Sequence, residues 1–138
     1  MTLLAFWAVS SQPALAERLA ITASIANIRS GPGSSYDILW SVQKYYPFEV
    51  IKKEGAWYQF RDFEGDSGWV HDSLAGKLQT VITAKPNCNV RTGAGTENEI
   101  VFSVGIGVPF KVLEQKNNWL RVLHADGDQG WIHDSLVW

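Results

Sequence analysis

The sequence of 138 residues contains a single cysteine, Cys88, and this scarcity limits its covalent and metal chemistry. A disulfide within the chain needs two cysteines, and structural zinc sites commonly use several. A disulfide and a cysteine-rich zinc site are therefore excluded for one chain. Cys88 corresponds to Ala26 in an internal repeat described below, so we expect a small buried residue in preference to a reactive thiol.

Blocks of lysine or arginine are also absent. The chain has 12 basic and 14 acidic residues and a formal net charge of −2. Binding to nucleic acid through a basic face is therefore disfavoured, because that mode depends on clustered positive charge. Contact with a cell wall or a membrane surface would have to rest on shape and on aromatic side chains.

Charge is missing altogether from residues 1–16, and their short apolar stretch is too short to span a bilayer as a helix. The triplet Ala14-Leu15-Ala16 has small residues at its first and third positions, which is typical of a signal-peptide cleavage site. We expect a signal peptide over 1–16, a mature start at Glu17, and export to the periplasm or the cell exterior. The usual positively charged start is missing, so an amphipathic first helix is the alternative.

The sequence does contain an internal repeat with an offset of 62 residues. About 19 of 48 aligned positions are identical without any gap, which an internal duplication explains. We predict two units, residues 17–76 and 77–138, each small enough to be marginally stable alone. The repeated motifs are Asn-Ile-Arg-Ser-Gly-Pro-Gly (27–33) with Asn-Val-Arg-Thr-Gly-Ala-Gly (89–95), Pro47-Phe48 with Pro109-Phe110, Trp57 with Trp119, and 65–74 with 127–136.

Each copy is predicted to consist of short strands separated by turns. Alternating apolar residues indicate strands at 38–42 and 57–61, and a further strand is expected near Ile25. Glycine and proline predict a loop at 30–35, while polar residues predict turns at 52–55 and 64–68. Residues 71–74 are expected to form a closing turn. This pattern favours a small all-β barrel or sandwich without long helices.

Together these motifs resemble the bacterial SH3 domain (SH3b). The resemblance covers roughly residues 19–76 and 81–138, and its specificity lies in the combination of motifs. It implies an all-β fold of two tandem SH3-like small β-barrels. It also implies a binding role, often toward peptidoglycan or its peptide stems.

Aromatic residues are the leading candidates for ligand binding. The alternation at 57–61 places Tyr58 and Phe60 toward the core and turns Trp57 outward, and Trp119 occupies the matching position. An outward tryptophan is costly in water unless it has a use. The alternative is that both tryptophans cover the barrel or the contact between copies.

Three tyrosines distinguish the first copy. Tyr36, Tyr45 and Tyr46 are expected to lie in loops near its groove, where the second copy has Asn98, Gly107 and Val108. We therefore hypothesise that the first copy binds the ligand, while the second is mainly structural or binds differently. On this interpretation the shared motifs are mostly scaffold.

Charged residues in the shared motifs allow two interpretations. Arg29 and Arg91 each follow a strand and precede a glycine-rich loop, so they could capture a ligand carboxylate. A salt bridge or stacking that holds the loop is the favoured alternative. His71-Asp72 and His133-Asp134 could hold a metal if the copies faced each other. The simpler expectation is that they shape the closing turn, with Asp72 and Asp134 capping its amides.

Catalysis is not expected. Cys88 has no counterpart in the first copy, and Glu64 and Asp66 are explained by turn composition. We predict no cofactor and no metal. The expected function is non-enzymatic binding of peptidoglycan or its peptide stems in the cell envelope. The alternative is a structural or interaction module that binds another envelope protein.

Overall fold

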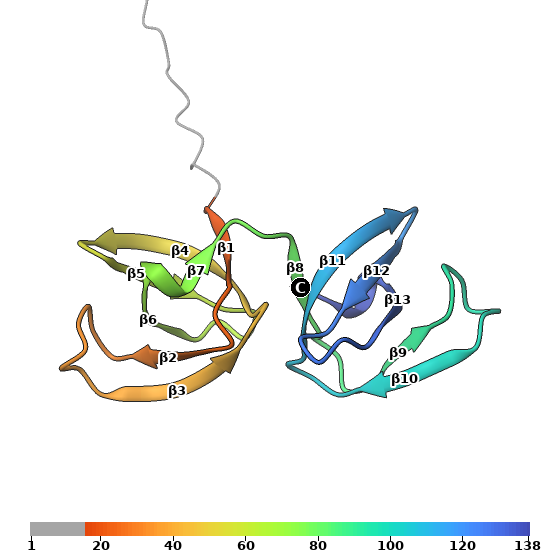
Figure 1. The fold of residues 1–138 in the computed structure, drawn as a ribbon, viewed down its shortest axis with the longest axis horizontal. Coiled ribbons are helices and arrows are strands. Elements are labelled where there is room, and N and C mark those ends of the chain that lie inside the picture. The colour runs from red at the N-terminus through yellow and green to blue at the C-terminus, as the bar shows by residue number, and fades with distance from the viewer. Residues whose placement is uncertain (1–15) are drawn as a thin grey trace, which may run out of the picture.

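The computed structural model describes residues 16–138, so the predicted signal peptide lies, except for Ala16, outside the described residues. Strands dominate the described part, and the helical segments in it are two single turns (Figure 1). The first copy contains β1 (Arg18–Ile21), β2 (Ile25–Arg29), β3 (Ile38–Gln43), β4 (Pro47–Glu54), β5 (Trp57–Arg61), β6 (Ser67–His71), η1 (Asp72–Leu74) and β7 (Ala75–Gly76). The second contains β8 (Thr80–Ile82), β9 (Cys88–Arg91), β10 (Ile100–Val104), β11 (Pro109–Lys116), β12 (Trp119–Leu123), β13 (Gln129–His133) and η2 (Asp134–Leu136).

Each copy forms its own antiparallel sheet. The strand order is β3-β2-β6-β5-β4-β1-β7 in the first copy and β10-β9-β13-β12-β11-β8 in the second. The second order therefore repeats the first element by element. The counterpart of β7 is reduced to an isolated bridge between Thr83 and Val137. The prediction of two tandem SH3-like small β-barrels is confirmed.

Bulges at equivalent positions bend the longest strand of each barrel. The register between β4 and β5 shifts between Val50 and Lys52, and that between β11 and β12 shifts between Val112 and Glu114. A bulge bends its strand and increases the local twist. Each long strand can thereby follow the curvature of a small barrel.

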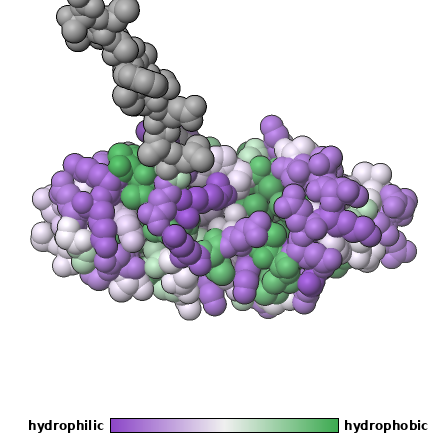
Figure 2. Space-filling view, turned by 90° about the horizontal axis from the view of Figure 1, so that it is seen from above, coloured by the Kyte–Doolittle hydropathy of each residue, from purple (hydrophilic) through white to green (hydrophobic). Residues whose placement is uncertain are grey.

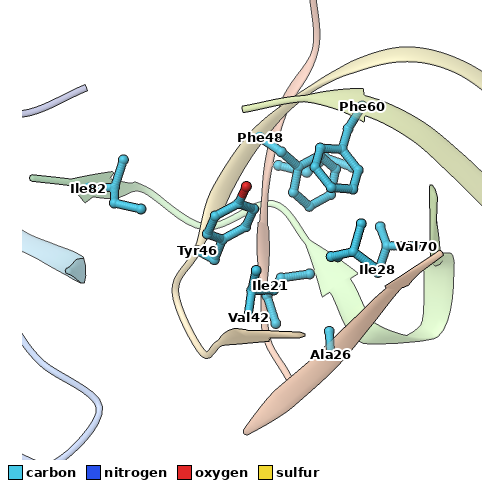
Figure 3. Packing of buried hydrophobic residues seen from close by; sticks show 10 residues of the cluster. Ile21, Ala26, Ile28, Val42, Tyr46, Phe48, Phe60, Val70 and Ile82 are labelled. Atoms are coloured by element: carbon cyan, nitrogen blue, oxygen red, sulfur yellow. The ribbon is translucent and has the colours of Figure 1, made fainter. Parts of the chain in front are cut away.

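Both barrels enclose an apolar core built from equivalent positions. In the first, Phe48 and Phe60 lie beside each other, with ring centroids 4.9 Å apart (Figure 3). Each such buried side chain contributes about 1.5–3 kcal/mol relative to exposure. The inward orientation of Phe60 confirms the alternation predicted for β5. The fully buried equivalent pairs are Ile28 and Val90, Phe48 and Phe110, Phe60 and Val122, and Val70 and Ile132.

The glycine of the repeated Gly-Trp-x-His motif lets two strands of each barrel approach closely. A Cβ atom at Gly130 would lie 2.6 Å from Val90 Cγ1 and 2.8 Å from the carbonyl oxygen of Arg91. At Gly68, a Cβ atom would overlap Ile28 Cγ2. Any side chain at these positions would therefore push β6 from β2, or β13 from β9.

Several strand boundaries differ from the predicted ones; β6, for example, begins at Ser67, inside the turn predicted at 64–68. The sequence pattern predicts no strand at 18–21, because Leu19, Ala20 and Ile21 are consecutive apolar residues and do not show the apolar-polar alternation of a half-buried strand. All three are buried in β1, as expected of a strand covered on both faces. The predicted polar turn at 52–55 is wrong in its extent, because β4 continues to Glu54. The turn itself follows at Gly55, whose φ is 57°.

The two barrels contact each other through Arg18 and Trp138, at the ends of the described chain, and through β8 at the start of the second copy. Ile82 of β8 is buried within the core of the first barrel, and Trp138 packs against that core. Arg18 Nη2 donates to the carbonyl oxygens of Thr80 (3.2 Å) and Trp138 (2.8 Å). Its guanidinium also lies 4.1 Å from the centroid of the Trp138 ring. These contacts, with the short connection between copies, join the barrels directly.

Candidate ligand-binding grooves

Each barrel carries a surface groove, and the two grooves are lined by equivalent residues. The first groove, of about 320 Å³, is lined by Ile25, Asn27, Arg29, Ser34, Trp57, His71, Ser73 and Leu74. The second groove, of about 230 Å³, is lined by Asn87, Asn89, Arg91, Thr96, Trp119, His133, Ser135 and Leu136. Every lining position of the first groove has its repeat counterpart in the second. All but Ile25 and Ser34 keep the same residue type.

A tryptophan and a histidine form one wall of each groove. Trp57 of β5 lies opposite His71 of β6 in the antiparallel ladder, and their ring centroids are 5.2 Å apart at 88°. Trp119 and His133 repeat this arrangement at 5.2 Å and 85°. Such edge-to-face pairs are favourable beyond simple burial. Both tryptophans are half-buried, so part of each indole remains open to the groove.

The histidine of each groove is held by the single helical turn that follows it. His71 Nδ1 accepts the N–H of Ser73 at 3.2 Å and lies 2.7 Å from Ser73 Oγ. His133 Nδ1 accepts the N–H of Ser135 in the same way, also at 3.2 Å. A nitrogen that accepts a hydrogen bond carries no proton, so the ring proton lies on Nε2.

This arrangement corrects the predicted capping of the closing turn. Asp72 and Asp134 lie inside η1 and η2, in the first turn of each helix. The residue before each of them, His71 or His133, is the N-cap. The prediction that the aspartates cap the turn is therefore wrong, because the capping position falls one residue earlier.

Arg29 and Arg91 hold the glycine-rich loops. Arg29 Nη1 donates to the carbonyl oxygens of Ser34 and Tyr36, both at 3.0 Å. Arg91 Nη1 donates to those of Thr96 (3.0 Å) and Asn98 (2.9 Å). The predicted loop-holding role is confirmed, with backbone hydrogen bonds in place of a salt bridge or stacking. Among the hydrogen bonds within residues 16–138, neither arginine uses Nη2 or Nε.

The asparagine of each Asn-x-Arg motif lies on the groove face of its strand. Residues two apart in a strand point to the same side, so Asn27 accompanies Arg29 and Asn89 accompanies Arg91. Asn27 Oδ1 accepts the hydroxyl of Ser41 at 3.2 Å, and Asn89 Oδ1 accepts that of Ser103 at 2.8 Å. The carbonyl end of each side chain thus makes a hydrogen bond within the barrel, while the amide nitrogen makes none among residues 16–138.

The three tyrosines predicted to line the groove of the first copy lie elsewhere. Tyr36 is 47% exposed, and its ring packs over Gly31 in the loop, outside the groove lining. Tyr45 and Tyr46 do lie between β3 and β4 in a turn, but they are only 8% and 5% exposed and do not line the groove. The reason is β1: Tyr45 N–H donates to Ile21 O at 2.8 Å, and Ile21 N–H donates to Tyr46 O at 2.9 Å.

Tyr46 instead lines a cavity of about 290 Å³ that residues of the second barrel, such as Gly107 and Pro109, help to enclose. Its hydroxyl donates to Oδ2 of the buried Asp62. The other carboxylate oxygen of Asp62 accepts the N–H groups of Glu64 (3.0 Å) and Asp66 (2.9 Å). Burial, and then the hydrogen bond to Asp62, raise the pKa of Tyr46 far above its ordinary value.

The shared motifs also supply most of the groove lining. Asn27, Ser34, His71, Ser73 and Leu74 were not predicted as site residues, yet they line the first groove beside the predicted Trp57 and Arg29. The second groove is likewise lined by the predicted Trp119 and Arg91 and by residues that were not predicted, namely Asn89, Thr96, His133, Ser135 and Leu136. The available signal was the repeat itself, because polar residues kept in both copies on one strand face mark a shared surface.

Other predicted features are accounted for within residues 16–138. Cys88 is fully buried, as predicted, and burial raises the pKa of its thiol. In this part of the chain no group of three or more His, Cys, Asp and Glu residues is placed to hold a metal ion. The same part contains no helix with the length and apolar character needed to cross a membrane.

Two joined antiparallel barrels with a repeated groove define a tandem SH3-like protein. The chain belongs to the bacterial SH3 domain family, which matches it at residues 22–75 and again at 84–138. Each match corresponds to one barrel. The resemblance drawn from the repeated motifs is therefore confirmed.

Individual relatives are similar to this chain over only part of their own length. "Putative N-acetylmuramoyl-L-alanine amidase YrvJ" of Bacillus subtilis is 29% identical over 122 residues, covering 80% of this chain and 23% of that protein. "Alpha,alpha-trehalose-phosphate synthase [UDP-forming] 2" of Aspergillus fumigatus is 29% identical over 112 residues, covering 68% of this chain and 22% of that protein. A solved NlpC/P60 family protein from Bacillus cereus is 14% identical with a TM-score of 0.43, covering 88% of this chain and 56% of that one. The chain thus spans about a quarter of the curated relatives it matches.

Proposed function

We propose that the chain is a non-catalytic binding module of the bacterial cell envelope, with two equivalent grooves that hold peptidoglycan or its peptide stems. The observation that carries this proposal is the pair of grooves, lined at matching positions by the same asparagine, arginine, tryptophan, histidine, serine and leucine. The amidase relative supports an envelope setting, since N-acetylmuramoyl-L-alanine is a component of peptidoglycan.

The composition of the grooves suits a ligand made of sugars and short peptides. A half-exposed tryptophan offers a flat apolar surface, and the surrounding polar groups can fix the orientation of a ligand. The face of the molecule seen in Figure 2 is mainly hydrophilic, with apolar surface in separate patches. Binding through small grooves fits this surface better than binding through one broad apolar face.

Exposed edge strands favour a second candidate, the binding of another envelope protein. β3 and β10 are the outermost strands of their sheets, and each exposes two large aliphatic residues at matching positions. Ile38 is 52% and Leu39 51% exposed, while Ile100 is 49% and Val101 51% exposed. An edge strand with exposed apolar residues can pair with an extended segment of another protein.

Sedimentation with purified peptidoglycan sacculi tests the first candidate. Wild-type protein is expected to sediment with sacculi, and the double variant Trp57→Ala/Trp119→Ala is expected to stay in the supernatant. Phe63→Ala is the matched control, because Phe63 lines the cavity between the barrels and the second copy has Ala125 at that position. Thermal melting of each variant verifies folding. Wild-type protein that does not sediment would exclude wall binding and favour the edge-strand candidate.

An envelope ligand also requires export, which the native N-terminus can test. The proposal expects the protein outside the cytoplasm with Glu17 as its first residue. A native protein found in the cytoplasm and starting at Met1 would contradict export.

A further inference from the structure

The asparagine and the histidine that line each groove each use an acceptor atom in a hydrogen bond within the barrel itself. Oδ1 of Asn27 accepts the Ser41 hydroxyl, and Nδ1 of His71 accepts the Ser73 amide. The same bonds recur at Asn89 and His133 in the second groove. What these side chains retain for a ligand is therefore the amide nitrogen of asparagine and the Nε2–H of histidine.

Arginine and tryptophan add only donors to this set. The guanidinium has five N–H groups and no acceptor, and the indole has one N–H. Within residues 16–138, Nη1 of Arg29 and of Arg91 is bonded to the loop, and no hydrogen bond involves their Nη2, their Nε or the indole nitrogens of Trp57 and Trp119. No aspartate or glutamate is among the residues lining either groove.

From this repeated arrangement we propose that each groove recognises a carboxylate group of its ligand, held by the arginine and the asparagine and flanked by the tryptophan. This inference rests on the proposed function and names the ligand group that the grooves take, namely a free carboxylate on a peptide stem. A carboxylate offers acceptors only, which matches the donors that the asparagine, arginine, histidine and tryptophan retain. Its two oxygens also fit the planar fork of a guanidinium.

The cavity between the barrels provides an internal contrast. It is lined by Asp62, Glu64 and Asp66 together with uncharged residues, and no lysine or arginine lines it. Acidic side chains there would repel a carboxylate. A carboxylate ligand is therefore directed to the two grooves and away from that cavity, although all three spaces have similar volumes of about 230–320 Å³.

Chemically modified sacculi test this inference separately from wall binding itself. Sacculi with carboxyl groups converted to carboxamides by carbodiimide and ammonia are compared with untreated sacculi. Because the protein has a net charge of −2, general electrostatics would favour the less negative, amidated sacculi. The inference predicts the opposite, namely binding that is about tenfold weaker or more after amidation. A third sample, stripped of phosphate-containing polymers, is expected to bind like untreated sacculi.

A variant that exchanges one donor for an acceptor tests the grooves directly. Asn27→Asp/Asn89→Asp keeps an oxygen that can accept the Ser41 and Ser103 hydroxyls but replaces the amide nitrogen by a carboxylate oxygen. We expect this variant to fold and to bind untreated sacculi about tenfold more weakly or worse. Gln79→Glu/Gln115→Glu adds the same two charges at exposed positions outside both grooves, and its binding should remain within about twofold of the wild type.

The outcomes separate the two proposals. Binding to untreated and amidated sacculi alike would overturn carboxylate recognition while wall binding stands. Binding to neither would overturn the proposed function itself. Binding that disappears when phosphate polymers are stripped would assign the grooves to phosphate and overturn the carboxylate inference. Unchanged binding of Asn27→Asp/Asn89→Asp, with a melting temperature like that of the wild type, would also overturn it.

Discussion

Under the proposed function, single residues in the grooves serve the barrel and the ligand with different atoms. Arg29 uses Nη1 for the loop carbonyls, Asn27 uses Oδ1 for Ser41, and His71 uses Nδ1 for the Ser73 amide. The atoms left over face no partner within the described residues. Because each side chain is fixed by its structural bond, little side-chain entropy is lost when a ligand binds. This preorganisation is present in both barrels.

The capping histidine gives a prediction at this scale. His133→Ala leaves the Ser135 amide without its acceptor, so we expect the free energy of unfolding in urea to fall by about 1 kcal/mol. His133→Asn removes the ring but supplies a good capping oxygen, and should be more stable than His133→Ala. Both variants lose the contact with Trp119, so their difference isolates the cap. Equal stabilities of the two variants would show that Nδ1 does not cap η2.

At the scale of elements, the crossing of β13 over β9 depends on a glycine. Gly130→Ala would place a Cβ atom 2.8 Å from the Arg91 carbonyl oxygen, a backbone atom that cannot rotate away. We expect overpacking to destabilise the second barrel by about 1–3 kcal/mol, measured by thermal or urea unfolding.

Gly105→Ala is the matched control for this substitution. The nearest atom to its added Cβ would be the Pro86 carbonyl oxygen at 3.8 Å, which is an ordinary contact. Its stability should therefore stay within about 0.5 kcal/mol of the wild type. If Gly130→Ala were equally harmless, close strand approach would not explain the glycine.

Much of the element structure could be predicted from sequence because the copies share a pattern. The strands at 38–42 and 57–61, the loop at 30–35 and the closing turn follow from local alternation and turn residues. β1 could not be predicted, because its burial depends on pairing with β4 and β7, which lie far along the chain. The same missing strand explains the misplaced Tyr45 and Tyr46. The local sequence places Tyr45 and Tyr46 near a turn, but it does not show that β1 packs against them.

The grooves were predicted only in part for a similar reason. Trp57, Trp119, Arg29 and Arg91 stood out by residue type. His71 joins them because β6 pairs with β5. The turn predicted at 64–68 indicates this pairing, but it does not give the register that places His71 opposite Trp57. Treating shared residues as scaffold also hid Asn27 and Asn89. A residue kept in both copies can serve a duplicated site as well as a duplicated fold.

At the scale of the whole molecule, the contact between barrels fixes two sites in one chain. Two linked sites on a repeating polymer can bind about 100-fold to 10,000-fold more tightly than either alone, provided both can engage at once. The grooves are similar but not identical, since exposed Ile25 at the rim of the first is replaced by Asn87 in the second. We therefore expect unequal contributions from the two sites.

Arg18 supplies a prediction about this contact. Arg18→Ala removes the hydrogen bonds to Thr80 and Trp138 and the stacking on Trp138. We expect the free energy of unfolding to fall by about 1–3 kcal/mol and the two barrels to unfold less cooperatively. Amide hydrogen exchange measured separately in each barrel tests this. Arg61→Ala, at an exposed site on β5, should leave the stability and the cooperativity of unfolding unchanged. If Arg18→Ala unfolded with unaltered cooperativity, the contact would not couple the barrels.

The central claim is that both grooves, and no other surface, hold the ligand. Its most direct test is a two-dimensional NMR titration of isotope-labelled protein with soluble peptidoglycan fragments. The account predicts that amide signals shift around Asn27, Arg29 and His71 and, at matching positions, around Asn89, Arg91 and His133. Shifts confined to the cavity lined by Tyr46 and Asp62, or to the edge strands β3 and β10, would contradict it.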